Sequence, residues 1–148
     1  MIEQETQAAF AIEKLYVKDV SVEVPNAPQI FLERTAPEIG VQLTTQSAPI
    51  SEGVFETIIK ATVTAKIGDT VMFLVEVAQA GIFRITGVPD DQIEPVLGIA
   101  CPNIVFPYLR EAVSDLVGRA GFPPVLLNPV NFEAMYLQQK QSASAATH

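Results

Sequence analysis

The chain has one histidine, His148, which is the last of its 148 residues and ends a stretch, SASAATH, whose composition predicts disorder. A Ser-His-Asp triad, a Cys-His pair or a histidine-containing zinc site needs an imidazole that a fold holds in place, so none of these is expected. The eight glycines are scattered and form neither a GxGxxG fingerprint nor a phosphate-binding loop. The sequence therefore carries no positive sign of an enzyme.

The chain also has one cysteine, Cys101, which begins the stretch CPNIVFPYLRE. A single cysteine cannot form a disulfide within the chain, and this agrees with a reducing compartment. As a nucleophile it would need an activating group, and its neighbours Ala100, Pro102 and Asn103 offer no cation. The pattern favours a small, buried, apolar side chain over an active-site thiol.

Charged residues are scarce, at 18% of the chain against roughly 25% in ordinary soluble domains, whereas hydrophobic residues make up 49%. So few charges cannot cover the surface of a domain of this size, which indicates an oligomer interface, an apolar binding groove, or both. The 17 acidic residues outnumber the 9 basic ones and give a net charge of −8. This balance disfavours nucleic acid and anionic lipid as partners and favours cationic ones.

Long apolar runs and a leader sequence are not apparent. We expect no apolar segment to reach the roughly 20 residues that span a bilayer. The N-terminal stretch MIEQETQAAF is acidic where a signal peptide would be basic. The expectation is a cytoplasmic protein with no direct membrane insertion.

Alternating apolar and polar residues predict strands in the first half of the chain. The alternation over 10–24 places Asp19 and Glu23 on one face, about 13 Å apart. Two further strands are expected at 39–43 and, with the cleanest alternation, at 54–66.

A fourth strand, 70–83, follows the hairpin signal Lys66-Ile67-Gly68-Asp69. Its outward face carries Met72, Leu74, Ala78 and Ala80 beside Glu76. That face is too apolar to meet water alone, so a loop or a partner is expected to cover part of it.

After Gly87 the hydrophobic period changes and predicts helices over 90–99 and 106–119, the second with Pro107 in its first turn. Prolines keep 122–129 extended, and Asn131 is expected to cap a last helix.

Four strands followed by helices is an α+β order. We expect a four-stranded antiparallel sheet with the helices packed on one side. The predicted division is a single domain over 10–141, a flexible segment over 1–9 and a disordered tail over 142–148.

Several stretches, in this order and at this spacing, together carry a resemblance that each alone would not. They are Tyr16-Val17-Lys18-Asp19-Val20-Ser21-Val22-Glu23-Val24-Pro25-Asn26-Ala27-Pro28, Ala61-Thr62-Val63-Thr64-Ala65, Gly81-Ile82-Phe83, Cys101 to Glu111, and Pro129-Val130-Asn131-Phe132. Over roughly residues 10–141 the chain resembles the SecB family of bacterial protein-export chaperones.

The resemblance implies a non-enzymatic holdase that binds no nucleotide, metal or other cofactor. It implies that the chain keeps unfolded secretory preproteins competent for translocation in the cytoplasm and passes them to the export ATPase SecA. It also implies a homotetramer assembled as a dimer of dimers.

Site residues follow from the resemblance position by position. The acidic patch that receives the basic, zinc-bearing C-terminal tail of SecA corresponds to Asp19, Glu23, Leu74 and Glu76. The client-binding groove corresponds to Ile39, Val41, Leu43, Phe132, Met135 and Tyr136. The tetramer interface corresponds to Tyr108, Leu109, Ala112 and Leu116.

Taken without the resemblance, some residues fit other interpretations. The carboxylates fit a solvated strand face, and Phe132 and Met135 fit ordinary core packing equally well. An apolar groove on an acidic sheet would also suit a carrier of small apolar ligands. A third hypothesis is a SecB-like chaperone dedicated to one partner such as an antitoxin.

Overall fold

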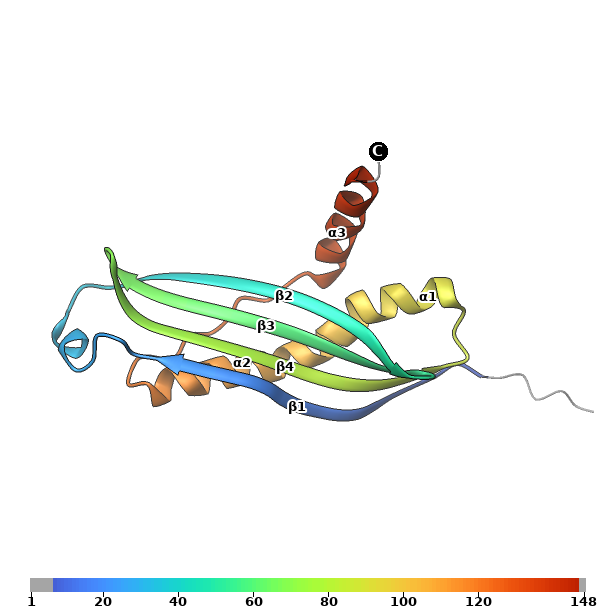
Figure 1. Cartoon of the computed structure of the whole chain (residues 1–148), viewed down its shortest axis with the longest axis horizontal. Helices are drawn as coiled ribbons and strands as arrows, with labels where there is room; N and C mark the ends of the chain where they lie inside the picture. Colours follow the sequence, from blue (N-terminus) through green and yellow to red (C-terminus); the bar gives the residue numbers. More distant parts are fainter. Residues whose placement is uncertain (1–6, 147–148) are drawn as a thin grey trace, which may run out of the picture.

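The computed structural model describes residues 7–146 of the chain, and Figure 1 shows their arrangement. A long sheet is followed along the chain by helices, which confirms the predicted α+β order. The elements are β1 (Ala9–Glu23), η1 (Gln29–Leu32), β2 (Glu38–Ser51), β3 (Val54–Ile67), β4 (Thr70–Thr86), α1 (Asp90–Pro95), η2 (Val96–Ala100), α2 (Cys101–Arg119) and α3 (Phe132–Ala146).

The four strands are antiparallel to their neighbours and lie in the order β1-β4-β3-β2. Strands β2, β3 and β4 form a meander whose hairpins turn at Gly53 and Gly68, both with positive φ, a conformation that glycine adopts at no steric cost. The predicted turn at Lys66-Ile67-Gly68-Asp69 is confirmed. Strand β1 pairs with β4, so the crossover segment that holds η1 carries the chain from one edge of the sheet to the other.

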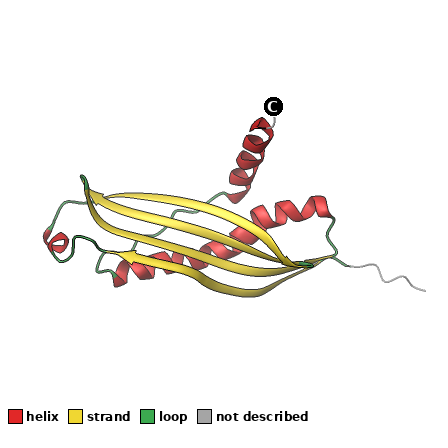
Figure 2. Cartoon of the chain, in the orientation of Figure 1, coloured by secondary structure: helices red, strands yellow, loops and turns green. Residues whose placement is uncertain are grey.

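Helix α2 lies across one face of the sheet, as Figure 2 shows, and packs on β3 and β4. We call this the inner face. The opposite, outer face is not covered by any helix among residues 7–146. An antiparallel sheet with one packed face reads as alternating apolar and polar residues, which is the pattern that made β3 so clear in the sequence.

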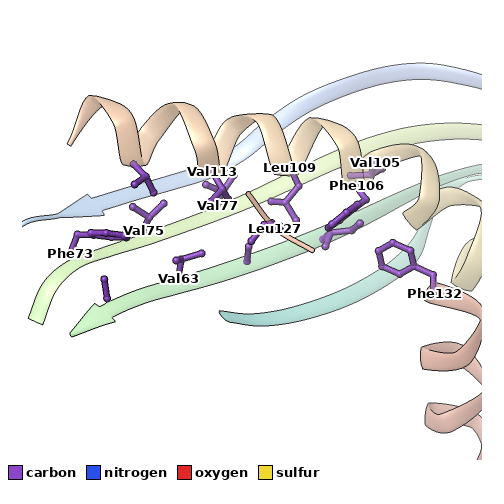
Figure 3. Close-up of a cluster of buried hydrophobic side chains, with 14 of the residues drawn as sticks. Val63, Phe73, Val75, Val77, Val105, Phe106, Leu109, Val113, Leu127 and Phe132 are labelled. Carbon is purple, nitrogen blue, oxygen red and sulfur yellow. The ribbon is translucent and has the colours of Figure 1, made fainter. Parts of the chain in front are cut away.

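The core lies between the inner face and α2. Val63 of β3 and Phe73, Val75 and Val77 of β4 point toward a stripe on α2 in Figure 3, and all four are at most 2% exposed. The stripe consists of Val105, Leu109, Val113 and Val117, each fully buried. Their spacing of four residues keeps them on one side of the helix.

The helical region differs from its prediction at one end. Helix α1 begins at Asp90 with Asp90 and Asp91 in its first turn, as expected. A π-helical turn, η2, then connects it to α2, which begins at Cys101, so Pro107 lies inside a helix rather than at its start. The prediction placed the break by proline alone, whereas the buried apolar residues before Pro107 hold the helix together across it.

The helical run Asp90–Arg119 is long and apolar enough to cross a membrane by length and composition alone, since an 18-residue stretch of it has a mean hydropathy of 1.2. The expectation that no segment would reach that length is therefore wrong. Side chains of α2 pack on the sheet, and we interpret the run as the core helix of this fold.

Helix α3 extends away from the sheet in Figure 1. Asn131 caps it as predicted, since Oδ1 of Asn131 accepts a hydrogen bond from the backbone N–H of Ala134 at 2.9 Å. The helix continues to Ala146, where the sequence predicts a disordered tail from residue 142, because a composition of serine and alanine also suits a helix. Residues 1–6 of the predicted flexible segment and 147–148 of the predicted tail lie outside the described residues.

Candidate functional site

An apolar groove with a volume of about 810 Å³ opens at the end of the sheet where the crossover segment lies. One wall is the inner side of β2, another is η1 with the residues after it, and the third is the extended segment that follows α2. It is lined by Ile30, Phe31, Glu33, Pro37, Ile39, Val41, Leu43, Met72, Phe73, Gly121, Phe122, Pro123, Pro124, Val125, Leu126, Leu127, Asn128, Pro129 and Val130.

The third wall exists because the chain cannot continue as a helix. Gly121 has a φ of +98°, which ends α2, and the prolines after it keep the backbone extended. At its start the ring of Phe122 lies between two others, with centroids 5.1 Å from Phe31 and 5.0 Å from Phe73. Through Phe122, these aromatic contacts connect η1 of the crossover segment to β4 of the sheet.

The walls leave apolar side chains open to solvent. Ile39 and Val41 are 48% and 44% exposed, and Leu126 is 74% exposed. Glu33 is the one charged residue among those of the described chain that line the groove. An open apolar surface with few directional groups suits ligands that share hydrophobicity rather than a particular shape.

The structure brings together half of the predicted groove residues. Ile39, Val41 and Leu43 line the groove from β2. Phe132 does not, because it is 2% exposed and its ring packs edge-on against Phe106 with centroids 5.6 Å apart. This burial favours core packing, which the sequence left as an equal alternative, and a contact between Phe132 and a client stays a prediction.

Two other predicted groove residues lie elsewhere as well. Met135 is half-buried against the core, and Tyr136 packs on Gly98 in η2. A Cβ at position 98 would lie 2.5 Å from Cδ2 of Tyr136, so glycine is what allows α3 to approach η2. These contacts attach α3 to the preceding helices and not to the groove. The segment 122–130, which lies between α2 and α3 in the chain, forms the groove wall in place of Met135 and Tyr136.

The residues that sequence reasoning missed are Phe31, Phe122 and Leu126. A signal was present for Phe122 and Leu126, since the proline-rich segment 122–129 is predicted to be extended and carries apolar side chains that a loop does not need. What the sequence did not indicate was that this segment lies opposite β2.

The second candidate region is on the outer face, where the four predicted docking residues do come together. Glu23 is paired with Leu74, and Asp19 with Ala78, across β1 and β4. Paired residues in an antiparallel sheet project from the same face, so Asp19, Glu23, Leu74 and Glu76 share the outer face. We call these four residues the acidic strand face.

Glu76 is not a free carboxylate. Nζ of Lys60, on β3, lies 2.8 Å from Oε1 of Glu76, and the hydroxyl of Thr62 donates to Oε2 at 3.4 Å. The hydrogen bond from Lys60 lowers the pKa of Glu76 and the same bond raises the pKa of Lys60. Lys60 was not singled out from the sequence, although strand parity alone places it on this face.

A second polar cluster lies further along the outer face. Glu56 accepts a hydrogen bond from the hydroxyl of Tyr16 and one at 2.9 Å from Nζ of Lys18. Burial, with the bond to Glu56, raises the pKa of Tyr16 to about 12, and the bonds from Tyr16 and Lys18 lower the pKa of Glu56.

The predicted interface residues divide into two kinds. Tyr108 is 49% exposed, and Ala112 and Leu116 are half-buried. Leu109 is fully buried against the sheet of its own chain, so in the single chain it belongs to the core, and its assignment to the intersubunit contact stays a prediction. The four-residue spacing puts Leu109 in the stripe with Val105 and Val113, so it belongs to the core.

Cys101 is buried at the start of α2. Burial raises the pKa of its thiol to about 11, although a hydrogen bond with Thr57 acts in the opposite direction. A neutral thiol closed off from solvent has no means of attacking a substrate. Within residues 7–146, no group of three His, Cys, Asp or Glu side chains could hold a metal ion.

Comparison with known proteins gives concordant matches. The family model described as "Preprotein translocase subunit SecB" matches residues 3–143. The "Protein-export protein SecB" of Thiobacillus denitrificans is 62% identical over 147 residues, covering 96% of this chain and 97% of that protein. The protein of the same name from Methylobacillus flagellatus is 59% identical over 143 residues, covering 97% and 91%.

A solved structure has a similar fold. It is a SecB-like chaperone from Mycobacterium tuberculosis in complex with a peptide from an antitoxin, with a TM-score of 0.66. The match covers 82% of this chain and 90% of that one at 16% sequence identity. At that identity the likeness concerns the fold alone.

Proposed function

The chain belongs to the SecB family of protein-export chaperones, which act in the cytoplasm and are not enzymes, and we propose that its apolar groove is where unfolded preproteins are held. The observation that supports this most is the groove itself, which keeps Ile39, Val41 and Leu126 exposed in a single chain. Exposing such side chains is unfavourable unless they cover other apolar surface for part of the protein's working cycle.

The groove suits many unrelated clients. Its walls are aliphatic and aromatic side chains with the flexible Met72, and hydrophobic contact does not depend on direction. An extended, unfolded segment can lie along the open edge strand β2, where its apolar residues would replace water on Ile39 and Val41. A folded protein has already buried its own apolar residues and offers little to such a site.

The proposal is tested by placing one charge in the groove. We expect Val41→Asp to weaken the chaperone, so that roughly ten times more protein is needed to slow the aggregation of a urea-unfolded preprotein to the same extent. The reason is that a carboxylate in an apolar site is costly to desolvate. Light scattering of the client measures this.

The matched control is Gln42→Glu. Gln42 is the next residue of β2 and projects from the outer face, where it is paired with Thr62. This variant should hold the client like the wild type. Equal loss in the two variants, or none in Val41→Asp, would mean that the groove is not the client site. Copurification with a lipid-like molecule instead of client binding would favour a carrier of small ligands.

For the second region, we infer that the acidic strand face is where the basic, zinc-bearing C-terminal tail of SecA docks. Two features support the inference. Asp19, Glu23 and Glu76 gather on a face that no helix covers in the described chain, and Leu74 lies half-buried beside them as an apolar contact. Clustered carboxylates attract a cationic segment and speed its encounter.

We further propose that the chain assembles as a homotetramer, a dimer of dimers. In support of this, Tyr108 on α2 is 49% exposed, and the edge strand β1 carries exposed apolar residues such as Phe10, Ile12 and Val20. A monomer would leave this surface in water. Light scattering of the purified protein, with and without an unfolded client, measures the assembly directly.

A further inference from the structure

The acidic strand face contains a cation of its own chain. Lys60 is paired with Ala78 in the register of β3 and β4, and Ala78 is paired with Asp19 on β1. Lys60 therefore projects from the outer face between Glu76 and Asp19. Its Nζ atom lies 2.8 Å from Oε1 of Glu76, and both carboxylates favour its charged form.

The contact between Lys60 and Glu76 is open to a competitor. The side chains are 48% and 33% exposed, so water and an incoming partner can reach both ends of the pair. Exposed ion pairs of this kind are weak and exchange easily, because water solvates each partner well when they separate.

The remaining carboxylates of this face differ from Glu76. Among residues 7–146, Asp19 and Glu23 take part in no salt bridge. Glu56, further along the outer face, is held by Lys18. An arriving cation thus meets Asp19 and Glu23 directly, but it must displace Lys60 to reach Glu76.

We propose that Lys60 is an internal competitor that sets the affinity of the acidic strand face for a basic partner segment. Lys60 is ion-paired with Glu76 while no partner is bound, and this ion pair breaks when the segment docks. Each docking event therefore breaks one ion pair for the one it makes at Glu76, which keeps binding at this position weak and readily reversible. The inference rests on the proposed docking of a basic tail on this face.

The test replaces the ammonium and keeps the side-chain length. We expect Lys60→Met to bind a zinc-loaded synthetic peptide of the SecA tail about two- to fivefold more tightly than the wild type at low ionic strength. The gain in affinity should shrink toward none as salt rises to about 0.5 M, because screening removes the electrostatic difference between Lys60→Met and the wild type. Calorimetric titration gives both values.

A matched variant separates competition from net charge. Lys14→Met also removes one positive charge from the outer face, on β1, where Lys14 is paired with Ile82 well away from Glu76. It should bind the peptide like the wild type. A Lys14→Met protein that gains as much as Lys60→Met would overturn the proposal, because the effect would then be one of overall charge.

A double-mutant cycle identifies the carboxylate concerned. In a Glu76→Gln background, Lys60→Met should increase the affinity for the peptide less than it does in the wild type, since there is no longer a Glu76 carboxylate for Lys60 to pair with. A Lys60→Met protein that binds like the wild type, or more weakly as Glu76→Gln does, would contradict competition. If either substitution lowers the melting temperature, Lys60→Gln repeats the comparison with a polar side chain.

The outcomes also distinguish this inference from the proposed function. If the wild type binds the peptide, Glu76→Gln weakens it and Lys60→Met does not strengthen it, docking stands and the competitor role fails. If neither the wild type nor Lys60→Met binds while client capture is intact, the docking assignment itself fails and takes this inference with it.

Discussion

Cys101 shows how one side chain looks different once its surroundings are known. It is fully buried, and its thiol interacts with the hydroxyl of Thr57, which is also fully buried and 2.7 Å from the hydroxyl of Ser47. The three side chains form a small polar cluster beneath the start of α2. The thiol contributes packing and a weak hydrogen bond there, and burial keeps it protonated.

This burial predicts a pH dependence of stability. The thiol has a pKa of about 11 in the folded chain against an ordinary value of 9.0, so between these pH values the unfolded chain has lost a proton that the folded chain retains. By linkage, the free energy of unfolding falls as pH rises through this window. Urea unfolding at pH 8, 9.5 and 10.5 measures the fall.

Cys101→Ala is the matched control, because other groups titrate in the same range and only the difference between the two proteins reports the thiol. The wild type should lose more stability than Cys101→Ala over the window, and client capture should be intact in both. A difference that stays constant with pH would show that the thiol is not shielded.

At the scale of elements, the strands were predictable and their irregularities were not. Alternation located β3 to within one residue, and it located the start of β4, which runs to Thr86 and not to 83. It indicated only 39–43 of β2, which spans Glu38–Ser51, because the apolar alternation stops after Leu43. In β1 two irregularities in the register, one after Ile12 and one after Val17, shift the alternation. Tyr16 therefore projects from the outer face toward Glu56, although strict period 2 groups it with Phe10 and Ile12. A bulge adds one residue and leaves no clear mark in the sequence.

The candidate sites follow the same division. The acidic strand face was assigned from the family resemblance, and strand parity agrees with that assignment because it places Asp19 with Glu23 and Leu74 with Glu76. The groove was found in part, since β2 supplies one wall but the opposite wall comes from a segment more than 80 residues later in the chain. The register of β2 against β3 gives no information on where 122–130 lies. The resemblance alone placed Phe132 and Tyr136 in the groove, whereas Phe122 and Leu126 line it in this chain.

On helix α2, the neighbouring residues Tyr108 and Leu109 are expected to affect different properties, assembly and folding. Leu109→Ala should lower the free energy of unfolding by about 2–5 kcal/mol, because it leaves a cavity between α2 and the sheet. Tyr108→Asp should leave the subunit folded and lower the mass of the assembly, because this neighbouring side chain is half-exposed. Circular dichroism and light scattering at one protein concentration distinguish the two effects.

Glu111→Ala, on an exposed part of the same helix, is the control for both measurements. If Leu109→Ala changed the mass of the assembly without changing the unfolding curve, the assignment of Leu109 to the core would be wrong. If Tyr108→Asp unfolded the subunit, Tyr108 would be needed for folding, and its exposure in the single chain would not identify it as an intersubunit contact.

At the scale of the molecule, the two proposed sites should be separable by substitution. We expect Glu76→Lys to weaken binding of the SecA tail on the order of tenfold at low salt, because it puts a second cation where the first already competes. Capture of an unfolded preprotein should persist, since the groove lies on the other face. Asp19→Ala should act in the same direction with a smaller effect.

Glu52→Lys is the control for charge reversal, since Glu52 is exposed in the turn between β2 and β3 and belongs to neither site. It should retain both activities. Loss of client capture together with tail binding in Glu76→Lys would indicate that Glu76 supports the fold rather than docking.

The sheet is a single layer, and this has a consequence for the order of events. Ile39, Val41 and Leu43 are paired with Ala65, Val63 and Ala61 and share their inner face, whereas Asp19, Glu23 and Glu76 project from the outer one. A client in the groove and a tail on the acidic strand face would therefore approach from opposite directions. Neither excludes the other, so a ternary complex of chaperone, client and tail is sterically allowed, and transfer of the client need not begin with its release.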